Sequence, residues 1–290
     1  MALTVNTNVA SLSAQRSMLN TNNALQTSFE RLASGKRINS ASDDAAGLAV
    51  SQSLTSAING VNQAMRNAND GISAAQIAEG ALSEVSDILQ RMRELAVQAN
   101  TSFLTATEKG YLQAEQESLE SALTDVATAA KFSGTSLFAA STFTFQTGST
   151  ATETSSFTSK AVAADGITDK DGNSVDLTAI DLTAANAAAT ANNASLAGGA
   201  QAAIEGLDDV IAGVNDLRAD FGAAISEFES QVRNLANIAE NTSAARSRIM
   251  DTDYAAETAM LTKNQILQQA STSILAQANQ QPQAVMALLQ

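Results

Sequence analysis

The side chains best suited to chemistry in this sequence are clustered carboxylates. Asp43 and Asp44 are adjacent, Asp208 and Asp209 are adjacent, and the run 169–175 places two aspartates before a glycine. Paired carboxylates can perform acid–base catalysis, and carboxylates spaced around a glycine turn can hold Ca²⁺. The run 169–175 has incomplete calcium-loop spacing and no closing glutamate. We therefore interpret it as a hairpin turn.

The other carboxylate pairs are better explained by structure than by catalysis. Asp43 and Asp44 close a segment rich in turn formers, just before a long helical pattern. We interpret Ser42 or Asp43 as the residue that caps this helix by accepting from its first free N–H groups. Asp208 and Asp209 are consecutive on a predicted helix, so their side chains point apart and suit solvation.

The composition excludes most other catalytic chemistry. The chain has no histidine and no cysteine, so it lacks the commonest general base, the commonest metal ligand and any disulfide or thiolate site. A zinc peptidase built on His-Glu-x-x-His is excluded for the same reason. We expect no enzyme activity, no metal and no cofactor.

Charge and hydropathy narrow the classes of partner. The 290 residues carry a formal net charge of −14, with a pI of about 4.3, which argues against a nucleic-acid-binding surface. No run of about 18 apolar residues is present, so we expect no membrane partner. The first residues lack the basic region of a secretory leader, so we expect no cleaved signal peptide.

Both ends of the chain combine helical spacing with a lack of charge. Residues 264–290 and 1–15 contain no Asp, Glu, Lys or Arg, whereas a lone surface helix normally has a charged wet face. We predict that these ends pack on each other and on other copies of the chain. The predicted self-assembly residues are Val5, Val9, Leu12, Leu19, Leu267, Ile274, Leu275, Val285 and Leu288.

The segments that position these ends have strong helical periodicity. Apolar residues at steps of three and four predict long helices, and the single proline, Pro282, leaves them uninterrupted. Short alternating runs at 143–145 and 156–162 predict strands. Predicted helices cover residues 3–34, 45–100, 107–130, 204–238 and the segment after the turn at 251–253.

The predicted fold is mainly α. We expect a long antiparallel helical rod or coiled-coil bundle in which the N- and C-terminal halves pair, with a small β-containing central insertion. The expected domains are a terminal helical domain (1–43 and 250–290), a rod domain (44–142 and 196–249) and a surface-exposed insertion (143–195).

Several motifs then identify a family. The runs 30–49 and 6–9 closely resemble the N-terminal motifs of bacterial flagellins, and the run 90–99 resembles their rod-domain motif. The runs 247–257 and 277–289 resemble their C-terminal motifs. Together these motifs occur in the expected order and cover about residues 1–140 and 200–290.

This resemblance implies a structural subunit that polymerises into the flagellar filament for swimming motility. It implies an extracellular location, export as an unfolded chain by the flagellum's own type III apparatus, and folding on assembly at the filament cap. It also implies a flagellar export chaperone bound to the C-terminal helix. The implied chaperone-binding residues are Leu261, Leu267, Ile274, Leu275, Val285 and Leu288.

The resemblance further implies detection by a host Toll-like receptor. The positions that match the recognised patch are Arg91, Leu95 and Glu115. The alternative explanation for these residues is an intramolecular or intersubunit contact. For the whole chain, the alternatives are a hook–filament junction protein and an adhesin displayed on the filament.

Overall fold

The computed structural model describes residues 7–148, 150, 152–163, 167–168, 174–183 and 199–287. For residues 168, 174, 179 and 281–287 it describes the backbone alone. The chain forms two compact units, the first made of Met1–Ile58 with Glu240–Gln290 and the second of Asn59–Ala239. In both units, segments from the two halves of the chain pack together, as the periodicity predicted.

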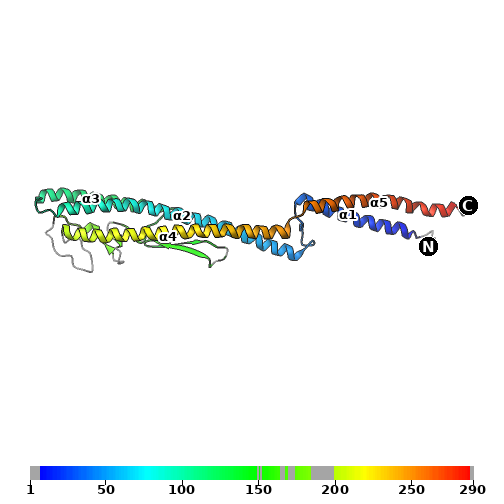
Figure 1. Ribbon diagram of the computed structural model, residues 1–290, viewed down its shortest axis with the longest axis horizontal. Helices are drawn as coiled ribbons and strands as arrows, with labels where there is room; N and C mark the ends of the chain where they lie inside the picture. Colours follow the sequence, from blue (N-terminus) through cyan, green and yellow to red (C-terminus); the bar gives the residue numbers. More distant parts are fainter. Residues whose placement is uncertain are drawn as a thin grey trace. The chain divides into compact units, whose positions relative to one another are not determined.

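The first unit pairs the two terminal helices, α1 (Val9–Ser34) and α5 (Tyr254–Ala287), which lie side by side (Figure 1). The side chain of Asn8 caps α1 by accepting from the N–H of Ser11 at 3.1 Å. Gly35 ends α1 in the left-handed conformation, at φ 69°, which a glycine adopts without a steric penalty. Asp253 caps α5 by accepting from the N–H groups of Ala255 and Ala256.

The next helix, α2 (Ala45–Ala99), corrects the predicted cap by one position. The carboxylate of Asp44 accepts from the N–H of Gly47 at 2.8 Å and is the residue that caps α2. Asp43 instead accepts from the N–H groups of Asn39 and Ser40 and closes the preceding loop. The prediction of Ser42 or Asp43 was wrong because a cap must directly precede the first helical residue.

The second unit is built from α2, α3 (Ala106–Ala129) and α4 (Ala200–Met250), which run together in Figure 1. Leu82, Val85, Leu89 and Met92 of α2 are completely buried, which confirms the predicted apolar seam. From α4, Leu217, Phe221 and Phe228 join the same core. Two ion pairs connect α2 to α4 beside this core: Glu79 with Arg218 at 2.9 Å, and Arg93 with Asp208 at 2.5 Å.

Short antiparallel hairpins follow α3, and the first of them precedes the predicted insertion (143–195). Their strands are β1 (Lys131–Phe132) with β2 (Thr135–Ser136), β3 (Thr142–Gln146) with β4 (Thr154–Thr158), and β5 (Ile167–Thr168) with β6 (Ser174–Val175). The pairing of β5 with β6 confirms a hairpin at this point, and its turn residues 169–173 lie outside the described residues. β4 ends at Thr158, so the strand predicted over 156–162 is displaced toward the N-terminus.

An aromatic cluster attaches the β3–β4 hairpin to α4. The ring of Phe157 lies edge-on to Phe221, with centroids 5.3 Å apart, and the ring of Phe145 lies edge-on to Phe228 at 5.6 Å. Phe143 packs against Phe157 within the hairpin. Such pairs stabilise by about 0.5–1.5 kcal/mol beyond their buried area. The observed fold therefore confirms the predicted class of long paired helices with a small β-containing insertion.

Candidate assembly surface

The fully buried residues of the contact between α1 and α5 are small or polar, and half-buried Met18, Leu25 and Leu32 of α1 and Leu261 and Leu275 of α5 alternate with them. The fully buried residues are Ser11, Ala14, Thr21 and Ser28 from α1, with Glu257, Ser271 and Ala278 from α5. Ser11 Oγ donates to Asn279 Oδ1 at 2.8 Å, and Gln268 Nε2 donates to Asn22 Oδ1 at 2.8 Å. Small side chains let two helices approach closely, and the polar contacts fix their register.

The large apolar side chains of the same helices are exposed. Val9, Leu12 and Leu19 of α1 are 66 %, 64 % and 63 % exposed, and Ile274 and Leu267 of α5 are 57 % and 43 % exposed. These side chains therefore do not form the contact between the terminal helices. A folded chain rarely leaves so many large apolar groups in water unless another molecule covers them.

The other predicted self-assembly and chaperone-binding residues are less exposed or lie where the structure describes no side chain. Leu261 and Leu275 are half-buried. Val5 and Leu288 lie outside the described residues, and Val285 lies on α5 where only the backbone is described. Sequence spacing missed Met260 and Ile266, which are 53 % and 61 % exposed on α5. Their signal was present in the sequence, because both are large apolar residues on an otherwise polar helix.

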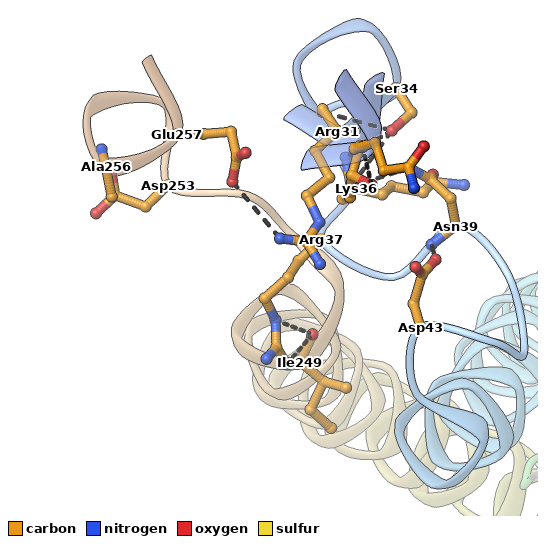
Figure 2. A network of polar contacts seen from close by, with 12 residues as sticks. Arg31, Ser34, Lys36, Arg37, Asn39, Asp43, Ile249, Asp253, Ala256 and Glu257 are labelled. Carbon is orange, nitrogen blue, oxygen red and sulfur yellow. Dashed lines mark hydrogen bonds and ion pairs between the residues drawn. The ribbon is translucent and has the colours of Figure 1, made fainter. Parts of the chain in front are cut away.

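A group of polar contacts, which we call the junction, connects the C-terminal end of α1 to the N-terminal end of α5 (Figure 2). The Nη1 atom of Arg31 lies 3.8 Å from Glu257 Oε2, and the Glu257 side chain is only 9 % exposed. Lys36 and Asp251 face each other in an isolated antiparallel bridge. This bridge ties the loop after α1 to the loop before α5.

Arg37 completes the junction by binding the end of α4. Its Nη2 donates to the carbonyl oxygen of Ile249 at 2.7 Å, and its backbone N–H donates to the carbonyl of Met250 at 2.6 Å. The last carbonyls of a helix have no partner within the helix and carry partial negative charge. Arg37 supplies these carbonyls with hydrogen-bond donors, and its guanidinium adds a compensating positive charge.

The predicted receptor-recognition residues divide between surface and core. Arg91 Nη2 lies 2.7 Å from Glu115 Oε1, and Arg91 Nη1 lies 3.0 Å from Glu94. The hydrogen bonds that Arg91 donates to Glu115, and then to Glu94, raise the pKa of Arg91. Leu95, by contrast, is 1 % exposed. Glu94 is the member of this cluster that sequence analysis missed, although its i, i+3 spacing from Arg91 was visible.

Comparison with known proteins places the chain in a family. Residues 5–142 match the bacterial flagellin N-terminal helical region, and residues 204–289 match the bacterial flagellin C-terminal helical region. The chain is 36 % identical over 375 residues to Flagellin B of Vibrio anguillarum, with both chains covered completely. The chain belongs to the bacterial flagellin family. Flagellin A of Vibrio cholerae serotype O1 is 36 % identical over 379 residues, again with full coverage of both chains.

Membership of the flagellin family identifies the chain as a structural subunit of the flagellar filament, which confirms the expectation from the motifs. A crystal structure of Bacillus cereus flagellin covers 62 % of this chain and 94 % of its own, at 26 % identity and a TM-score of 0.45. Strands β4, β5 and β6 lie between the two matched regions, whereas β1 and β2 lie within the N-terminal match.

Among the residues that the structure describes, no three His, Cys, Asp or Glu side chains are grouped so that they could hold a metal. In the same part of the flagellin chain, no helix is both long enough and apolar enough to cross a membrane.

Proposed function

We propose that the exposed apolar faces of α1 and α5 are the surfaces on which subunits polymerise. The observation that carries this proposal is the exposure of Val9, Leu12, Leu19, Leu267 and Ile274, which lie outside the contact between the two helices. Full burial of one such side chain is worth about 1.5–3 kcal/mol. Several of them per subunit give a large driving force for assembly.

The same arrangement supports folding that is completed on assembly. Among the described residues, α1 and α5 pack chiefly on each other, and the fully buried residues of their contact are mostly serine, threonine and alanine, with a few half-buried leucines beside them. Helices with so little fully buried apolar packing are marginal in water. We therefore propose that the chain passes through the flagellar type III export apparatus unfolded and orders its ends at the filament cap outside the cell. A repeated contact between unlike surfaces extends into an open helical polymer.

The exposed face of α5 also fits an export chaperone. An amphipathic helix binds a groove through apolar anchors at helical spacing, and Leu267 and Ile274 supply such anchors at i and i+7. Because these side chains are also proposed to polymerise, a chaperone bound to them would block premature assembly. Leu261, Leu275, Val285 and Leu288 remain proposed contacts of the same helix.

Receptor recognition is a second proposal, carried by the exposed ion pair of Arg91 and Glu115. Their side chains are 49 % and 44 % exposed and lie on neighbouring helices. We propose that a host Toll-like receptor contacts these two groups directly, and that buried Leu95 acts by fixing the helix beneath them. Arg91→Ala and Glu115→Ala should weaken binding to the receptor ectodomain, whereas Arg233→Ala, at an exposed pair of α4, should not.

Seeded polymerisation tests the assembly proposal. Leu19→Gln and Ile274→Gln each remove an exposed apolar group, so the critical concentration for filament growth should rise at least about tenfold, which corresponds to 1.4 kcal/mol. Ser273→Gln is the control, because it enlarges an exposed polar neighbour of Ile274 and removes no apolar area. Unchanged critical concentrations in both apolar variants would overturn the proposal. Failure of the unmodified chain to extend seeds would favour the hook–filament junction alternative.

A further inference from the structure

Helix α3 carries two buried polar side chains without hydrogen-bond partners. Gln116 is completely buried and Glu120 is 8 % exposed. Neither Gln116 Oε1, Gln116 Nε2 nor Glu120 Oε1 has a hydrogen-bond partner among the described residues. An unsatisfied buried polar group costs about 1–3 kcal/mol. The burial of these unsatisfied polar atoms is unfavourable, and core packing alone does not explain it.

Glu120 lies beside a segment of the insertion, because it lines one pocket together with Thr178. We call residues 176–183 the docking segment, and it contains the 3₁₀ helix η1 (Leu177–Ala179). Its Leu177, Ile180 and Leu182 are buried. One turn of helix before Glu117, Gln113 of α3 accepts from the N–H of Leu182 at 2.9 Å and donates to the carbonyl of Ile180 at 3.0 Å.

The pocket between α3 and the docking segment is lined mainly by acidic and hydroxyl side chains. A cavity of about 410 Å³ between α3 and the docking segment is lined by Glu117, Glu120, Ser121, Thr124, Asp125 and Thr178. None of these lining residues is a lysine or an arginine. From the docking segment, the carboxylate of Asp176 adds further negative charge. The arginines of α2 in this part of the unit are engaged elsewhere, Arg91 with Glu94 and Glu115, and Arg93 with Asp208.

The protonation of Glu120 follows from these surroundings. Burial, and then the negative charges of Glu117 and Asp176, raise the pKa of Glu120 to about 7. The amide of Gln116 lies near enough to oppose the rise, but it does not reach hydrogen-bond geometry with the carboxylate. Residues at i and i+4 are neighbours on a helix. A neutral Glu120 carboxyl offers the amide both a donor and an acceptor, whereas a carboxylate offers acceptors alone.

We propose that Glu120 is a pH-sensitive latch for the docking segment. In its neutral form, Glu120 tolerates burial and lets the segment dock on α3. In its charged form, Glu120 is repelled by Glu117 and Asp176 and draws water into the cavity, so the segment opens. The latch needs no second copy of the chain, and it operates in the monomer.

The direction of the pH effect follows from the raised pKa. A carboxyl group that is more easily protonated in the docked state favours docking at low pH, and this advantage is lost as the pH rises through about 7. Each unit of pKa difference between the docked and open states corresponds to a tenfold change in the docking equilibrium. Docking should therefore weaken by at least about tenfold between pH 5.5 and pH 8.5.

Hydrogen exchange on the monomeric full chain tests the latch. The readout is the protection factor of the Leu182 amide, corrected for the intrinsic pH dependence of exchange. In the unmodified chain this protection should fall at least about tenfold between pH 5.5 and pH 8.5. In Glu120→Gln, which keeps the side-chain shape and cannot ionise, it should stay constant. The Leu137 amide, which donates to the carbonyl of Ala130 at 3.0 Å, serves as an internal reference.

Two further variants sharpen the test. Glu117→Gln removes a charge that raises the pKa of Glu120, so the transition should move to lower pH and the total loss of protection should become smaller. Asp125→Asn is the matched control, because it removes an exposed carboxylate from the same cavity and should leave the midpoint near pH 7. Equal loss of protection in the unmodified chain and in Glu120→Gln would overturn the proposal, as would pH-independent protection of Leu182 in the unmodified chain.

Discussion

Gly71 of α2 faces the ring of Phe228 of α4 at the van der Waals limit. A Cβ atom on Gly71 would lie 3.0 Å from Phe228 Cζ and 3.2 Å from both adjacent ring atoms. Phe228 is 1 % exposed and is itself packed edge-on against Phe145 of the β3–β4 hairpin. The absence of a side chain at position 71 therefore sets how closely the two long helices and the hairpin approach each other.

Gly71→Ala should destabilise the second unit although alanine is the better helix former. Overpacking typically costs about 1–3 kcal/mol, and the gain in helix propensity is about 1 kcal/mol, so we expect a net loss of about 1 kcal/mol. Gly80→Ala is the matched control, because nothing lies within 4 Å of a Cβ there, and it should stabilise by about 1 kcal/mol. Urea unfolding measures both, and equal shifts in the same direction would contradict the packing argument.

Arg37→Ala should weaken the junction of the first unit. It removes the guanidinium that binds the Ile249 carbonyl at 2.7 Å, and a hydrogen bond of this kind is worth about 1 kcal/mol. The amides of α5 should therefore exchange about fivefold faster in the monomer. Arg248→Ala removes an exposed arginine from the last turn of α4 without breaking that contact. If both variants accelerate exchange equally, net charge and not the contact is responsible.

Thr105→Ala should fray the start of α3. Thr105 and Glu108 form a reciprocal capping box, in which Glu108 Oε2 accepts from the Thr105 N–H at 2.7 Å. Removal of a threonine cap typically costs about 1 kcal/mol. The first-turn amides of α3 should lose protection while those near Leu123 keep theirs, as measured by site-resolved hydrogen exchange. Thr107→Ala, at the second residue of the same helix, keeps the box and should leave the pattern unchanged.

The loop before α2 should depend on acid pH through Asp43. Hydrogen bonds from the N–H of Ser40, then from the N–H of Asn39, lower the pKa of Asp43 below its ordinary value of 3.8. A carboxylate with a lowered folded pKa stabilises the loop above its unfolded pKa, and this contribution is lost as the pH falls through the folded value. An NMR titration of the Asn39 and Ser40 amides should therefore show a midpoint below 3.8. A midpoint above that value would contradict the hydrogen-bonded loop.

The sequence predicted the helices well because their signals are local. Steps of three and four in the apolar residues identified α2 and α4, and the buried seam of Leu82, Val85, Leu89 and Met92 is the seam that the spacing predicted. The missing histidines and cysteines also excluded whole classes of chemistry, since no fold can supply a side chain that the sequence lacks. The five matching runs predicted the family, which the comparisons then confirmed.

Other features depended on which face meets which partner, and only the tertiary structure decided them. Periodicity shows that Leu12 and Leu19 share a face of α1, but it cannot show that α5 covers the opposite face instead. Burial likewise separates Leu95 from Arg91, although both lie in one short motif. The sequence determined the elements and the chemistry available to them. The pairing of distant segments decided which side chains are exposed and which, like Glu120, are buried. Burial depends on contacts with other segments and not on residue type alone.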